Sequence, residues 1–211
     1  MTDLAYRPAS NLPCGTPRET KKMTSAVIAQ RVFPRSRTGA VLLVVAAAAL
    51  TALAAQIVIP LPFTPVPITG QTFAVLFTGA ALGWKLGAAG QLLYVAVGAF
   101  GAPVFTEASG GVEVIRGATG GYLIGFIFAA GLVGWLAEHR QDRAFLAMVA
   151  AFLMGSAVIY LFGVVGLMTA TGWGLGEAVA KGVTPFIVGD LVKAGIAGVI
   201  LPGSWRLLGE S

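Results

Sequence analysis

Two ionisable side chains, Asp190 and Lys193, interrupt an apolar stretch near the end of the sequence. They stand three residues apart, so on a helix they share one face. Because an unpaired charge inside a membrane is costly, we expect both to face the interior of the protein. An aspartate offers strong acceptors and a lysine strong donors, which suits a ligand group with both, such as a urea or an amide. An internal ion pair and a proton relay through Asp190 are the alternative interpretations.

Four neutral polar residues are further candidates for ligand binding, namely Gln71, Gln91, Tyr94 and Tyr122. Each of their side chains can both donate and accept a hydrogen bond. A hydrogen bond between two helices is the alternative role for Gln91 and Tyr94.

The turn Thr119-Gly120-Gly121 stands directly before Tyr122, at the start of an expected helix. Backbone N–H groups are free in a first helical turn, and the helix dipole is positive there. We therefore expect this turn to accept a ligand carboxylate. Glycine also serves plain turn geometry, which is the alternative.

Motifs for other chemistry are missing from the sequence. It contains no G-x-x-x-x-G-K-[ST] phosphate loop and neither the G-x-S-x-G nor the H-E-x-x-H hydrolase motif. A single cysteine, Cys14, and a single histidine, His139, leave no zinc site of the usual kind. We expect no catalytic residues, no bound metal and no cofactor, and transport driven by ATP would need a separate ATPase.

The elements that carry these residues are expected to be membrane helices. Of the 211 residues 56% are apolar and only 11% are charged, whereas soluble domains carry about 25% charged residues. The mean hydropathy is +0.83. Six helices of about 20 residues fit the length from residue 38 onward, so the sequence predicts an all-α integral membrane protein. The expected spans are residues 38–59, 70–83, 85–100, 120–137, 144–168 and 183–207, separated by a proline-rich loop at 60–67 and glycine-rich loops at 101–119 and 169–182.

Residues 1–37 are expected to form a disordered basic tail before a membrane domain at 38–211. The tail holds seven of the 14 Lys and Arg residues, two of the nine acids, and four prolines. A basic segment before a membrane helix favours the cytoplasmic side over contact with nucleic acid. Six spans then put both termini in the cytoplasm, and they put the loops at 60–67 and 101–119 on the outer face of the cell membrane. We expect a ligand pocket open to that face.

Several ordered stretches resemble the BioY family. They include residues 62–72 (PFTPVPITGQT), 98–105 (GAFGAPVF) and 117–126 (GATGGYLIGF), and the resemblance extends over residues 41–207. It implies a six-helix substrate-binding subunit of an energy-coupling-factor (ECF) transporter, which captures biotin from outside. The implied partners are biotin, membrane lipids, a transmembrane coupling subunit and two cytoplasmic ATPases.

The resemblance also implies roles for individual residues. Asp190 and Lys193 match the aspartate and lysine that bind the bicyclic head of biotin in the family, and this head is a cyclic urea. The family's loop before the fourth helix closes over the ligand, which makes Tyr122, Gly121 and Gly120 candidates for contact with the ligand tail or for the lid.

The first helix carries a face of small residues, Ala48 and Ala52, which would let another helix approach closely. In the family this face is the docking surface for the partner. The chain departs from the family at Ala118, where members often have proline. An asparagine that some members use for the ligand has no match, and Gln91 or Ser109 could substitute for it.

Two other functions are consistent with the residues alone. The first is a stand-alone secondary transporter of biotin or another small vitamin, with Asp190 as a proton-coupled gate. The second is a membrane enzyme with Asp190 as a base, which the lack of a second catalytic group disfavours.

Overall fold

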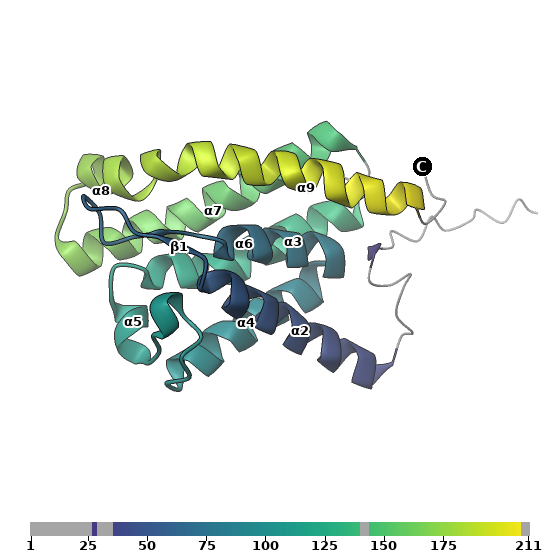
Figure 1. The fold of residues 1–211 in the computed structure, drawn as a ribbon, viewed down its shortest axis with the longest axis horizontal. Coiled ribbons are helices and arrows are strands. Elements are labelled where there is room, and N and C mark those ends of the chain that lie inside the picture. Colours follow the sequence, from purple (N-terminus) through teal and green to yellow (C-terminus); the bar gives the residue numbers. More distant parts are fainter. Residues whose placement is uncertain (1–26, 29–35, 140–143, 208–211) are drawn as a thin grey trace, which may run out of the picture.

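The computed structural model describes residues 27–28, 36–139 and 144–207, and the predicted tail lies almost entirely outside them. Each of the six predicted spans overlaps one of the main helices, with bounds that differ by a few residues. They are α2 (Arg37–Ala55), α3 (Gln71–Leu82), α4 (Trp84–Ala99), α6 (Gly120–Glu138), α7 (Phe145–Thr171) and α9 (Ile187–Leu207). Figure 1 shows the six as one layered bundle, with α9 and α7 along one side and α2 and α4 along the other.

The first span is shorter than predicted, because α2 ends at Ala55 and the apolar run continues as a strand. β1 (Val58–Ile59) pairs antiparallel with β2 (Ile68–Thr69), with Val58 opposite Thr69. The run Ile57-Val58-Ile59 is β-branched and stands directly before Pro60, and both features favour an extended backbone. The proline-rich loop is therefore the tip of a small hairpin that returns the chain to α3.

The glycine-rich loops contain helices that the sequence did not predict. η1 (Thr106–Ala108) and α5 (Val112–Arg116) precede α6, and α8 (Leu175–Gly182) precedes α9. The sixth predicted span begins with a separate short helix, η2 (Thr184–Phe186), before α9. Gly172 ends α7 in the left-handed conformation, with φ at 75°. A glycine at this position is a common helix stop, and it separates α7 from α8.

The helix α6 lies at the centre of the bundle and packs against α3, α4 and α7. Its contact with α7 depends on Gly121, where an added Cβ would clash with the Phe162 carbonyl oxygen and lie 2.9 Å from the Cα of Gly166. Two glycines in register therefore bring these helix backbones together, as small residues do in membrane bundles.

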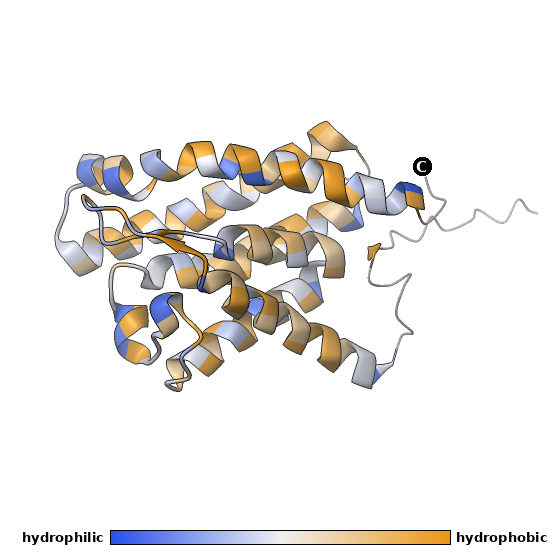
Figure 2. Ribbon diagram, viewed as in Figure 1, coloured by the Kyte–Doolittle hydropathy of each residue, from blue (hydrophilic) through white to orange (hydrophobic). Residues whose placement is uncertain are grey.

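Four helical segments in the described residues are long and apolar enough to cross a membrane. They are Arg37–Ala55, Gly120–Glu138, Phe145–Thr171 and Leu175–Leu207, the last of which joins α8, η2 and α9. Figure 2 shows mostly apolar residues along α9 and α2 and several polar residues in α5 and α8, and large apolar side chains of α2 and α9, such as Leu42 and Val188, are exposed. The chain is thus a multi-pass membrane protein, and its apolar surface matches a lipid environment.

The two ends of the bundle differ. The start of α2 and the end of α9 lie at one end, whereas the β1–β2 hairpin, α5 and α8 lie at the other (Figure 1). The elements that interrupt the regular helices are therefore collected at the end away from the described chain ends.

Candidate functional site

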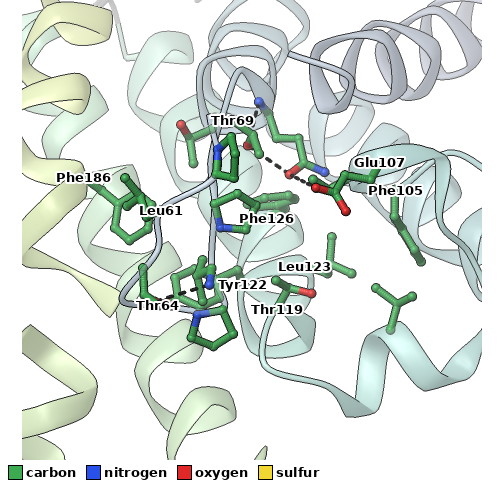
Figure 3. Close-up of a pocket in the computed structure, with 18 of the residues that line it drawn as sticks. Leu61, Thr64, Thr69, Phe105, Glu107, Thr119, Tyr122, Leu123, Phe126 and Phe186 are labelled. Carbon is green, nitrogen blue, oxygen red and sulfur yellow. Dashed lines mark hydrogen bonds between the residues drawn. The ribbon is translucent and has the colours of Figure 1, made fainter. Parts of the chain in front are cut away.

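Residues of the β1–β2 hairpin, α6 and α9 line a cavity of about 280 Å³. Figure 3 shows Tyr122, Leu123 and Phe126 of α6 lining it, with Leu61 and Thr64 of the proline-rich loop close by. The lining also includes residues of α3, α7 and α9 and of the segment before α6. The residues that line the cavity are Pro60, Leu61, Thr64, Pro65, Val66, Pro67, Thr69, Gln71, Thr72, Phe105, Thr106, Glu107, Ser109, Val114, Thr119, Tyr122, Leu123, Phe126, Tyr160, Phe186, Asp190 and Lys193.

Asp190 and Lys193 both line this cavity, on the first turns of α9. The Asp190 side chain is 5% exposed and that of Lys193 is 19% exposed, and Lys193 Nζ lies 3.4 Å from Asp190 Oδ1. The predicted pair on one helix face is therefore present. A buried carboxylate and an ammonium side by side offer acceptors and donors to one polar ligand group.

Neighbouring helices hold the two charged groups from different sides. Lys193 Nζ donates to Thr72 Oγ1 in the first turn of α3 at 2.6 Å, and to the carbonyl oxygen of Thr69, the last residue of β2, at 3.0 Å. The Tyr160 hydroxyl of α7 donates to Asp190 Oδ2 at 2.5 Å. The site is thus assembled from α3, α7 and α9.

Sequence reasoning did not identify Tyr160 or Thr72 as site residues. Tyr160 is a polar side chain inside the apolar span 144–168, and Thr72 follows the candidate Gln71. Both positions can be read from the sequence, but neither shows which helix the side chain faces.

Gln71 lines the cavity, and Tyr94 supports it from behind. Gln71 Nε2 contacts the Tyr94 hydroxyl oxygen at 2.5 Å, and that hydroxyl donates to the Val104 carbonyl oxygen at 3.2 Å. Gln71 Oε1 accepts from Thr69 Oγ1 at 3.1 Å and from Thr106 Oγ1 at 3.4 Å. Tyr94 is 1% exposed and does not line the cavity. This network fixes the segment before α6 to the bundle.

The segment that carries Glu107 is held in an unusual backbone conformation at the cavity. Glu107 and Ala108 both have positive φ, 58° and 52°. Gln56 at the end of α2 holds the segment, since its Nε2 donates to the Phe105 carbonyl oxygen and its Oε1 accepts from the Ala108 N–H, each at 3.1 Å. The exposed Glu107 is the third charged residue of the lining.

In the turn at the start of α6, some residues line the cavity and others pack against the neighbouring helix α7. Thr119 and Tyr122 line the cavity, whereas Gly120 and Gly121 do not. The Tyr122 hydroxyl donates to the Gly182 carbonyl oxygen at 2.8 Å, so Tyr122 presents its ring to the cavity rather than a free hydroxyl. The two glycines are buried, and Gly121 serves the contact with α7.

Gln91 was expected to contact the ligand, but it does not line the cavity. Its side chain is fully buried, and Nε2 donates to Thr51 Oγ1 and Thr78 Oγ1, each at 3.1 Å. Those residues belong to α2 and α3, so Gln91 of α4 joins three helices. The interhelical role is the one that the geometry supports. Ser109, the other candidate for the missing asparagine, does line the cavity.

Ala48 and Ala52 lie on the inner side of α2, where both are partly buried and pack against the core. The side chains that α2 presents outward are larger, including Leu42 and Leu53, which are 65% and 70% exposed. In the described residues no group of three or more histidine, cysteine, aspartate or glutamate side chains could hold a metal ion.

Comparison with known proteins identifies relatives of this chain. The sequence model of the BioY family matches residues 22–210. The biotin transporter BioY of Thermotoga maritima is 39% identical over 142 residues, which cover 67% of this chain and 82% of that protein. The probable biotin transporter BioY of Pyrococcus horikoshii is 43% identical over 152 residues, which cover 72% of this chain and 87% of that protein.

A solved structure shares the fold. The crystal structure of an S-component for biotin from an ECF-type ABC transporter superposes with a TM-score of 0.72 at 26% identity, covering 82% of this chain and 93% of that one. The family match includes all the described residues, and with them the cavity lining and the Asp190–Lys193 pair. The chain belongs to the BioY family.

Proposed function

We propose that this protein binds biotin and serves as the substrate-binding subunit through which biotin crosses the cell membrane. The Asp190–Lys193 pair at the cavity is the observation that carries the proposal. The N–H groups of a cyclic urea would donate to the Asp190 carboxylate, and its C=O would accept from Lys193 Nζ. Relatives over most of the chain are named as biotin transporters, which supports the same ligand.

The rest of the cavity suits the remainder of the ligand. Phe105, Phe126 and Phe186 supply apolar surface for the thioether ring and the alkyl chain, and a mostly apolar pocket with a few polar groups is typical of small-molecule sites. The segment between Thr106 and Thr119 would then surround the carboxylate end. Biotin is the transported ligand, and we propose no cofactor, metal or catalytic residue.

The proposal includes six membrane spans, formed by α2, α3, α4, α6, α7 and α9. The short α3 would be covered by its neighbours α4, α6 and α9. The basic tail would keep both termini in the cytoplasm, so the cavity would open outward. An ATP-driven ECF module, with a transmembrane coupling subunit and two cytoplasmic ATPases, would supply the energy. This follows from the similarity to an S-component of an ECF-type ABC transporter.

Calorimetry of biotin binding to the purified chain in detergent tests the proposal. We expect tight binding by the wild type and a loss of at least about 30-fold for Asp190→Asn and Lys193→Ala, because each change leaves a buried charge without its partner. Glu177→Gln and Lys181→Ala are matched controls. These residues form the same kind of pair on α8, with Lys181 Nζ 2.8 Å from Glu177 Oε1, away from the cavity lining. Their affinities should equal that of the wild type.

A folded wild-type protein that does not bind biotin would overturn the proposal. Binding that survives both cavity substitutions would leave the function intact and return the pair to a structural role. Uptake by vesicles holding this chain alone, stopped by collapse of the proton gradient, would instead favour a stand-alone proton-coupled transporter.

A further inference from the structure

We propose that Tyr160 is a positioning residue of the ligand site, which keeps the Asp190 carboxylate apart from Lys193 and aimed into the cavity. The proposal rests on the proposed function, since it explains how the charged pair stays open to a ligand with both donors and acceptors. Tyr160 acts through Asp190.

The Tyr160 hydroxyl is the contact that holds Asp190 from another helix. The Tyr160 hydroxyl donates to Asp190 Oδ2 at 2.5 Å. The other carboxylate oxygen, Oδ1, lies 3.4 Å from Lys193 Nζ on the same helix as Asp190. A hydrogen bond from a neutral donor to a carboxylate is about twice as strong as one between neutral groups. Tyr160 therefore fixes the orientation of the Asp190 carboxylate, which the backbone of α9 does not determine.

The distance between the charges shows why such a contact is needed. Lys181 and Glu177 on α8 approach to 2.8 Å in a setting that is more exposed to solvent. Asp190 and Lys193 are more buried, where attraction between opposite charges is stronger, yet they stay 3.4 Å apart. Lys193 donates to Thr72 of α3 and to Thr69 of β2, whereas Asp190 accepts from Tyr160 of α7. Contacts on opposite sides thus keep the pair from closing on itself.

An open pair leaves polar capacity for a ligand. A carboxylate has about four lone-pair sites, and Tyr160 and Lys193 occupy one on each oxygen. If the Tyr160 hydroxyl were absent, rotation of Asp190 toward Lys193 would give a tighter ion pair. A ligand urea would then have to break that pair before binding, and its affinity would fall.

The ring of Tyr160 also lines the cavity, with its centroid 6.5 Å from that of Phe186. Tyr160→Phe keeps this ring and removes one oxygen atom. The substitution therefore isolates the hydrogen bond to Asp190 from the packing.

Equilibrium binding of biotin to the full chain in detergent tests this inference. We expect Tyr160→Phe to weaken binding by about 10-fold or more, as for loss of a hydrogen bond to a charged group. In an Asp190→Ala background, where no carboxylate needs to be held, the same change should alter affinity by no more than about 2-fold. Binding is expected to be weak in the Asp190→Ala protein and in the double variant, so their affinities are measured at high biotin concentration.

The outcomes separate the inference from the function on which it rests. An equal loss in both backgrounds would mean that the hydroxyl contributes to packing or touches the ligand itself, and would overturn the positioning role. Wild-type affinity in Tyr160→Phe, alongside a large loss in Asp190→Asn, would overturn the inference and keep the proposed function. Absence of biotin binding by the folded wild type would overturn the proposed function itself. Melting without ligand checks that each variant is folded.

Discussion

At the scale of single residues, Gln91 shows how the same side chain can suit a ligand or a helix contact. Its Oε1 is buried and has no hydrogen-bond partner in the described part of the chain. Thr51 Oγ1 and Thr78 Oγ1 accept from its Nε2 but also donate to backbone carbonyl oxygens of their own helices. Removal of the amide would therefore leave neither threonine donor without an acceptor.

We predict that Gln91→Met changes the free energy of unfolding by less than about 1 kcal/mol, because the loss of two neutral hydrogen bonds is offset by removal of an unpaired buried oxygen. Biotin affinity should stay within about 2-fold of the wild type. Melting and calorimetry of the detergent-solubilised protein measure both quantities.

Gln91→Ala is the control that shows the position is sensitive to packing. It leaves a void between three helices, which we expect to lower stability by about 2 kcal/mol or more. A drop in biotin affinity of 10-fold or more in a stable Gln91→Met protein would put Gln91 back at the ligand site.

The sequence predicts the candidate site in part, for a physical reason. The spacing of Asp190 and Lys193 sets their shared helix face whatever else the protein does, so their joint position was predictable. Contacts with Tyr160 and Thr72 depend on which helices become neighbours, and spacing within one helix carries no such information. The direction of the Tyr122 hydroxyl, toward Gly182, likewise follows from the packing of α8.

At the scale of elements, apolar length predicts the six main helices well and the connecting segments poorly. A run of about 20 apolar residues leaves few alternatives to a helix. The segments at 101–119 and 169–182 contain many glycines, and the sequence therefore predicts loops, although the first contains η1 and α5 and the second contains α8. In α8 the pair Glu177 and Lys181, four apart, and the stacking of Lys181 over Trp173 stabilise the short helix.

Two glycines with equal space around them should respond differently to substitution by alanine. A Cβ added at Gly111 or at Gly176 would meet no atom within 4 Å. Gly111, before α5, has φ at 99° and ψ at 163°, a conformation that is essentially restricted to glycine, whereas Gly176 lies within the helix α8. Backbone conformation alone therefore distinguishes the two sites.

We predict that Gly111→Ala lowers the melting temperature by at least about 2 °C, since such backbone strain costs about 1–3 kcal/mol. Gly176→Ala, the matched control, should leave the melting temperature unchanged or raise it by about 2 °C, because alanine favours a helix. Thermal unfolding of the two variants beside the wild type gives the comparison. A stabilising Gly111→Ala would contradict the backbone conformation described for this segment.

At the scale of the whole molecule, the proposed direction of capture depends on how the two ends of the bundle are placed in the membrane. The start of α2 and the end of α9 share one end of the bundle, and the hairpin, α5 and α8 share the other (Figure 1). Positive residues are retained on the cytoplasmic side of membrane proteins, so under the proposed topology the basic segment before α2 would orient the whole bundle. The cavity would then face outward, which is the side from which we propose that biotin is bound.

We predict that α8 is reached from outside the cell and the tail only from inside. Cys14 is the only cysteine in the chain, so the wild type already reports on the tail. In a Cys14→Ser background, Glu177→Cys puts a single thiol on an exposed position of α8. A membrane-impermeant maleimide added to intact cells should label Glu177→Cys and leave the wild type unlabelled until the membrane is permeabilised. Labelling of Cys14 in intact cells, with protection of Glu177→Cys, would show the opposite orientation, in which the cavity opens to the cytoplasm. Capture from outside would then be wrong even if the protein binds biotin.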